Sequence, residues 1–145
     1  MSLSLRPSAA ARRLVAWLTE KAPKSLLILT HDHPDPDALA SAWALSLVAH
    51  KVARTRVRIA YGGILGRREN RTMLDSLALP AVPLRPGDLD SGAVALVDTQ
   101  PPFRNNRFPF PKRRRPDIVI DHHPRSPETE ARLALIDTSV GATTT

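Results

Sequence analysis

Three short apolar segments each lead directly into aspartate or histidine residues, and this repeated pattern constrains the fold most strongly. Leu26–Thr30 runs into HDHPDPD, Ala93–Val97 is followed by Asp98, and Asp117–Ile120 is followed by DHHP. Continuous apolar runs of this length are typical of strands covered on both faces, as in parallel sheets. The carboxyl ends of parallel strands share one edge, where ligands bind in open α/β folds. We therefore expect these polar residues to gather at one place.

The rest of the chain alternates helix and strand signals. Helices are expected at Ala9–Lys21, Ala38–His50 and Arg67–Leu77, and further strands at Arg56–Tyr61 and Arg132–Ile136. This alternation favours βαβ units with right-handed crossovers. The 145 residues suit one domain. The predicted class is α/β, with a mostly parallel sheet of about five strands flanked by helices on both faces.

Proline and glycine mark the connections between these elements. The segments 80–87 and 100–115 are predicted as loops because each contains several prolines. The prolines of HDHPDPD oppose an early helix start, so Asp37 or a neighbour is expected to cap the helix that follows. The final SVGATTT is expected to open another helix, with residues 143–145 as its cap and first turn.

Composition excludes several classes of protein. There is no cysteine, so disulfides and thiolate metal sites are excluded. The longest apolar stretch, Ala38–Ala49, contains two serines and is too short to span a bilayer. Arg12 and Arg13 interrupt what would be the apolar centre of a secretory signal. We expect a cytoplasmic protein without a membrane partner.

The formal net charge of +7 comes largely from one segment. Its cations are Arg104, Arg107, Lys112, Arg113, Arg114 and Arg115. Three interpretations stay open: a solvated loop, a contact with a part of the protein that is missing from this sequence, or a surface that holds a polyanionic substrate. Phe103, Phe108 and Phe110 lie among these charges, where they either stack on a base or anchor the loop to the core.

The residues at the predicted sheet edge suit divalent cations. Oxygen and imidazole ligands without thiolates favour Mn²⁺, with Mg²⁺ or Co²⁺ as alternatives. A two-metal hydrolase needs a carboxylate that bridges cations held ~3.5–4 Å apart. His31, Asp35 and Asp37 share one loop and can turn toward two ions. Asp98 can bridge the ions, and His122 can bind the second.

Two further residues are candidates for catalysis. His123 can face a substrate phosphate, because adjacent residues at a strand end project in different directions. Asp121 either holds an imidazole in its ligating tautomer or makes a purely structural hydrogen bond. His33 is interpreted as a solvated loop residue, and Asp137 as part of a local turn.

HDHPDPDALAS, LVDTQ and VIDHHP, in that order, resemble motifs I, II and III of the DHH phosphoesterase superfamily. IDTSVGATTT resembles the stretch after motif III in its nanoRNase-like members. The resemblance implies a metal at His31, Asp35 and Asp98, a second metal at Asp37, Asp98 and His122, and a phosphate contact at His123.

The resemblance also implies what the chain lacks. The family's fourth metal-binding motif and its C-terminal DHHA1 domain have no counterpart in this sequence. We therefore expect residues 1–145 to be a partial DHH domain, the first part of a longer enzyme. Its second metal site would be incomplete, and its activity alone would be weak or absent.

By resemblance, the expected function is that of a Mn²⁺-dependent phosphoesterase or exonuclease of the DHH type. Its substrates would be short single-stranded oligonucleotides, nucleoside bisphosphates or cyclic dinucleotides. One alternative is a hydrolase of pyrophosphate or polyphosphate, and another is a catalytically incomplete fragment that binds metal or nucleotide. A homodimer of the full-length protein stays open.

Overall fold

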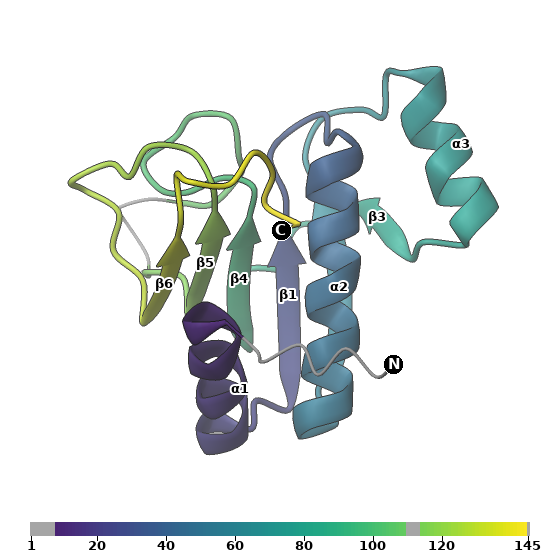
Figure 1. Cartoon of the computed structure of the whole chain (residues 1–145). Helices are drawn as coiled ribbons and strands as arrows, with labels where there is room; N and C mark the ends of the chain where they lie inside the picture. Colours follow the sequence, from purple (N-terminus) through teal and green to yellow (C-terminus); the bar gives the residue numbers. More distant parts are fainter. Residues whose placement is uncertain (1–7, 110–113, 145) are drawn as a thin grey trace, which may run out of the picture.

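A computed structural model describes residues 8–109 and 114–144 and contains, within those ranges, a six-stranded, all-parallel sheet (Figure 1). The strand order is β3-β2-β1-β4-β5-β6. The strands are β1 (Ser25–Leu29), β2 (Arg56–Tyr61), β3 (Ala81–Pro83), β4 (Ala93–Val97), β5 (Ile118–Asp121) and β6 (Leu133–Ile136). The predicted α/β class with a parallel sheet is confirmed, with one strand more than expected.

The strand order reverses at the centre of the sheet. After β1 the chain moves outward through β2 and β3, then returns to β4 on the other side of β1 and moves outward again through β5 and β6. Leu27 of β1 pairs with Arg58 on one side and Val94 on the other. The loops that follow β1 and β4 therefore leave in opposite directions, and a crevice forms between them.

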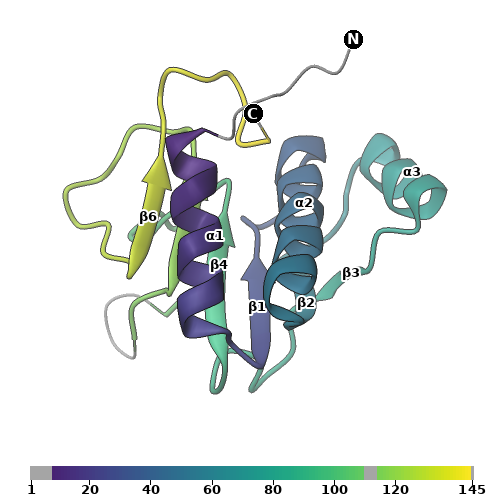
Figure 2. The same cartoon turned by 60° about the horizontal axis from the view of Figure 1, so that its bottom comes forward.

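The two faces of the sheet are covered differently. Helices α1 (Ala9–Lys21) and α2 (Pro36–Ala53) pack on one face, where Leu18 and Leu45 are buried against the strands (Figure 2). On the other face the core includes Phe108, from the proline-rich loop after β4, with Leu84 and Leu89 packed against it. Within the described ranges, loop side chains thus cover the face for which a second layer of helices was expected.

Helix α2 begins earlier than the sequence predicted. Asp35 is its N-cap, and its Oδ1 accepts a hydrogen bond from the backbone N–H of Ala38 at 3.0 Å. Pro36 then occupies the first helical position, where a missing N–H costs nothing and the fixed φ angle suits the helix. The start predicted at Ala38 is therefore wrong by two residues, because proline was treated only as a helix breaker.

Helix α3 (Arg68–Leu77) and strand β3 lie at the far edge beside β2 (Figure 1). The segment 80–87 was predicted as loop, yet Ala81–Pro83 pairs with β2. A proline is compatible with this position because an edge strand need not donate every N–H. None of the helices in the described part of the chain is long and apolar enough to cross a membrane.

The segment after β6 does not open a helix over its described residues. Ser139–Thr144 forms bends and turns instead, and Thr145 lies outside the described residues. The interpretations that concern Phe110, Lys112 and Arg113 also fall outside them. Phe108 is 7% exposed and anchors its loop to the core, which decides between the two roles considered for it.

Candidate metal centre

His31 and Asp98 meet in the crevice where the strand order reverses. His31 follows β1, Asp98 follows β4, and His31 Nε2 lies 3.4 Å from Asp98 Oδ2. Asp98 is 3% exposed and has a φ of 58°, in the left-handed region that aspartate rarely occupies. Strained residues of this kind cluster at functional sites, where the surrounding structure holds them. Here the sharp turn directs the carboxylate into the crevice.

The first group of candidate ligands comprises His31, Asp35 and Asp98. Its three ligand atoms lie within 4.8 Å of one another, and His31 Nε2 is 3.9 Å from Asp35 Oδ1. His31 Nδ1 lies 2.8 Å from the carbonyl oxygen of Asp32. Since a carbonyl only accepts, Nδ1 carries the proton of the neutral ring and Nε2 faces the crevice. The spacing and the tautomer both suit a cation.

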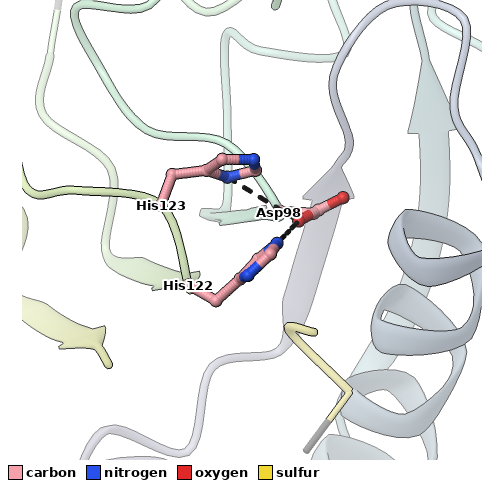
Figure 3. A group of neighbouring side chains, drawn as sticks. All are labelled: Asp98, His122 and His123. Carbon is pink, nitrogen blue, oxygen red and sulfur yellow. Dashed lines mark ion pairs between the residues drawn. The ribbon is translucent and has the colours of Figure 1, made fainter. Parts of the chain in front are cut away.

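The second group comprises Asp98, His122 and His123 (Figure 3). Both histidines follow β5 and turn toward Asp98 from the same side. His122 Nε2 lies 3.4 Å from Asp98 Oδ1, and His123 Nδ1 lies 3.9 Å from the same oxygen. The two carboxylate oxygens of Asp98 therefore face two different groups, with Oδ2 toward His31 and Oδ1 toward His122.

Asp37 lies on the first turn of α2, close to the second group. Its Oδ2 is 3.9 Å from His122 Nε2. The backbone N–H of Thr143 donates to Asp37 Oδ2 at 2.7 Å, and the Thr144 hydroxyl donates to Oδ1 at 2.9 Å. The Thr143 hydroxyl also donates to Asp98 Oδ1 at 2.7 Å. A cation at this position would share these carboxylate oxygens with the threonines, whose contacts the sequence did not predict.

Asp121 supports the histidines from below the crevice. Its side chain is fully buried, and its Oδ1 accepts hydrogen bonds from His123 Nδ1 at 2.7 Å and from the backbone N–H of His122 at 2.8 Å. Asp121 thus makes structural hydrogen bonds to the backbone and contacts the imidazole of His123, and its role in holding a metal-ligating imidazole stays a prediction. Because His123 Nδ1 faces Asp121, its Nε2 is left for another partner.

Gln100 connects the Asp121 carboxylate through hydrogen bonds to the loop after β5. The sequence analysis did not predict this role. Gln100 is fully buried and donates through Nε2 to Asp121 Oδ2 at 2.7 Å. Its Oε1 accepts from the hydroxyl of Thr129 at 2.6 Å and from the backbone N–H of Ser126 at 3.0 Å. Gln100 is a polar residue close to the end of β4 and to the candidate ligand Asp98, and this was the signal that the sequence offered. Its position in a proline-rich loop gave no reason to expect that its side chain is buried.

Charge in the crevice is arranged to receive a cation. The hydrogen bond with Asp98 raises the pKa of His31 more than burial lowers it. Burial alone would raise the pKa of Asp98, but the hydrogen bonds from His31 and Thr143 hold that pKa below its ordinary value. Asp98 is therefore ionised at neutral pH, and a bound metal would replace the positive charge that a proton on His31 supplies.

The residues between His31 and Asp35, in the loop after β1, are held by contacts with other parts of the chain. These contacts fix the conformation of the loop. Asn70 of α3 is 4% exposed and donates from Nδ2 to the carbonyl oxygen of Pro34 at 2.7 Å. His33 is exposed, and its Nδ1 accepts from the backbone N–H of Ile64 at 3.1 Å. Arg107 Nε lies 2.9 Å from Asp32 Oδ2. His33 is thus away from the candidate ligands, as predicted.

The remaining predicted polar residues have local roles. The side chain of Asp137 accepts from both the backbone N–H and the hydroxyl of Ser139, as expected for a turn. Arg114 donates to Asp117 Oδ2 and to the carbonyl oxygen of Gly92, each at 2.9 Å. Arg107 binds Asp32 instead, so these two arginines of the basic segment contact different parts of the molecule.

Comparisons with known proteins agree with this geometry. The family model described as "DHH family, N-terminal domain" matches residues 25–145, a range that begins with β1. The uncharacterized protein MJ1633 of Methanocaldococcus jannaschii is 39% identical over 125 residues, which is 86% of this chain and 24% of that protein. The chain thus spans about a quarter of the length of this curated relative.

Proposed function

The chain belongs to the DHH family, whose members form a metal-dependent phosphoesterase superfamily, and we propose that it carries the two-metal site of a Mn²⁺-dependent phosphoesterase. The observation that supports this most directly is the orientation of Asp98. Its two oxygens face different groups, at 3.4 Å from His31 and 3.4 Å from His122. A carboxylate in this position is what a bridge between two cations requires.

The proposed ligands divide between the two cations. His31 and Asp35 would hold the first cation together with Asp98, and Asp37 and His122 would hold the second together with the same carboxylate. The donor set of oxygen and imidazole atoms fits Mn²⁺. When bound, the cations would generate a nucleophile from water at neutral pH and stabilise charge on the phosphoryl oxygens.

His123 is proposed to bind the substrate phosphate. Its side chain is 46% exposed, and its Nδ1 is engaged by Asp121 at 2.7 Å. This hydrogen bond orients the ring with Nδ1 toward Asp121, so Nε2 faces away from that carboxylate. A charged His123 would then donate from Nε2 to a phosphoryl oxygen as its negative charge grows.

The substrates that we propose are short single-stranded oligonucleotides, nucleoside bisphosphates or cyclic dinucleotides. Each contains a phosphoester next to a nucleoside, and each is small enough to bring one phosphate to the base of a crevice. Because the chain spans about a quarter of the length of its relative, the activity and substrates of a protein of that length are part of this proposal.

The decisive experiment is Mn²⁺ binding by Asp98→Asn. The amide keeps the size of the side chain but removes its negative charge. We therefore expect Mn²⁺ affinity to fall by more than the ~10–100-fold that is typical when a residue hydrogen-bonded to a metal ligand is lost. Calorimetric titration of the chain with Mn²⁺ measures this affinity directly. Asp137→Asn, in an exposed turn, is the control. Near-normal Mn²⁺ affinity in Asp98→Asn would contradict the proposal.

A further inference from the structure

A cavity of about 580 Å³ opens at the carboxyl ends of β2 and β3. Its lining includes Tyr61, Gly63, Leu84, Arg85, Leu89 and Arg107. This volume falls within the range of small-ligand sites. None of the proposed metal ligands lines it. The cavity is therefore a separate space on the same edge of the sheet as the candidate metal centre.

The cavity adjoins the loop that supplies the first group of ligands. Strand β2 pairs directly with β1, and paired strands lie ~4.8 Å apart. The backbone N–H of His33 donates to the carbonyl oxygen of Gly62 at 3.1 Å, and Arg107 binds Asp32 at 2.9 Å. Gly62 and Arg107 thus belong both to the cavity wall and to the surroundings of this loop.

Glycine is needed where the cavity wall meets the loop. A Cβ atom on Gly62 would overlap the side chains of Asp32 and Arg107, and one on Gly63 would lie 2.5 Å from the His33 ring. The φ of Gly63 is 68°, which side chains other than glycine rarely adopt. This close contact fixes the cavity wall relative to the loop that carries the first group of candidate ligands.

The lining combines apolar surface with two cations. Tyr61 is 8% exposed, and Leu84 and Leu89 pack against the core beneath. Arg85 and Arg107 are exposed. Arg107 is paired with Asp32 at 2.9 Å and Asp90 adds an acidic group, so Arg85 is the cation considered for a ligand. Guanidinium groups stack on bases and pair with phosphate. A nucleoside would contact the apolar surface of the cavity, whereas an inorganic phosphate chain would not.

On the opposite side of the crevice, buried side chains pack behind Asp121. There Gln100 and Thr129 fill the region behind Asp121, at 0% and 3% exposure. A substrate whose phosphate reaches Asp98 therefore has room for its neighbouring group on the β2–β3 side.

We propose that this cavity binds the nucleoside next to the phosphate that is hydrolysed, so the site selects nucleotides over inorganic phosphate chains. The proposal rests on the proposed function, which supplies the position of the phosphate. The base would lie on Tyr61 and the two leucines, with Arg85 at the rim stacking on it or binding its outer phosphate.

The test compares Arg85→Glu with Arg68→Glu, which makes the same change of charge at an exposed position on α3 outside this cavity. Calorimetry on the Mn²⁺-loaded chain measures the affinities for AMP and for inorganic phosphate. We expect the wild-type chain to bind AMP more tightly than phosphate. Arg85→Glu should lower the affinity for AMP by about tenfold and change the affinity for phosphate by less than about twofold. Arg68→Glu should change neither affinity.

Three results would overturn the proposal: equal binding of AMP and phosphate, an unchanged AMP affinity in Arg85→Glu, or equal effects of Arg85→Glu on both ligands. Failure of the proposed function is seen separately, as a wild-type chain that does not bind Mn²⁺. Photo-crosslinking with 8-azido-AMP gives an independent readout. We expect it to label the segments that line the cavity, 61–63, 83–90 or 107–109, and labelling elsewhere would contradict the location.

Discussion

The two sides of the crevice are built in different ways. On the β4–β5 side, buried side chains bind one another: Gln100 donates to Asp121 at 2.7 Å and accepts from Thr129 at 2.6 Å. On the β2–β3 side, Asn70 is the buried residue of α3, and its amide donates to Pro34 in the loop that carries candidate ligands. The first side carries Asp98, His122 and His123, and the second carries the cavity.

This difference suggests a division of work between the two sides. Metal ligands must be held in a fixed geometry, which a fully bonded buried network provides. A ligand cavity gains from an element that can adjust, and elements with few buried bonds open at lower free energy. Four substitutions test whether the two sides differ in this way.

The largest effect is expected for Asp121→Ala. This change removes the acceptor for His123 Nδ1, Gln100 Nε2 and the backbone N–H of His122. Because the Gln100 amide and the His122 backbone N–H would lose their acceptor, the free energy of unfolding should fall by about 3–5 kcal/mol. Urea denaturation measures it, with Asp137→Ala as an exposed control expected to unfold like the wild type. A loss below about 1 kcal/mol would remove the basis for calling this side rigid.

Gln100→Leu should have the next largest effect. The leucine fills most of the volume but leaves Asp121 Oδ2 and the Thr129 hydroxyl with fewer partners. We expect the free energy of unfolding to fall by about 2 kcal/mol. Combining it with Asp121→Ala should give less than the sum of the two losses, because both act on one network. Additive losses would show that the network is not a unit.

Asn70→Leu should act locally. It removes the hydrogen bond to Pro34, while Asn70 Oδ1 already lacks a hydrogen-bond partner. We expect a loss of about 1 kcal/mol and faster amide hydrogen exchange in α3 and the loop before α2, with the β5 amides unchanged. If exchange in β5 rises equally, the two sides are not independent.

The smallest effect is expected for Leu47→Gln. Leu47 is 57% exposed and, with Leu77 of α3, lines an open apolar cavity of about 420 Å³ between α2 and α3. The free energy of unfolding should change by less than about 0.5 kcal/mol. A loss above about 1 kcal/mol would mean that apolar packing, rather than Asn70, holds α3 in place.

Much of the fold follows from local sequence signals. Ala93–Val97 and Arg56–Tyr61 are strands with the predicted bounds, because apolar runs closed by polar or glycine residues leave little choice. The gathering of His31, Asp98 and His122 followed from the shared edge of parallel strands, and the structure brings them together. Their roles as ligands stay a prediction.

The missed features depend on contacts between distant parts of the chain. Strand β3 is three residues long and contains a proline, so only its pairing with β2 defines it. The contacts of Thr143 and Thr144 with Asp37 join residues more than a hundred positions apart. Loop side chains, including Phe108, cover one face of the sheet. The prolines and charged residues next to Phe108 in the sequence are typical of a solvated loop, so its burial could not be predicted.

The central pairing of β1 with β4 also has a consequence for folding kinetics. Leu26 pairs with Ala93, so the chain must first pass through α2, β2, α3 and β3. Closing such a long loop is entropically costly and slows the search for the native topology. An early intermediate that contains only the β1–β2 pairing would hold His31 far from Asp98. Cation capture by these residues would therefore follow the closure of this long loop rather than precede it.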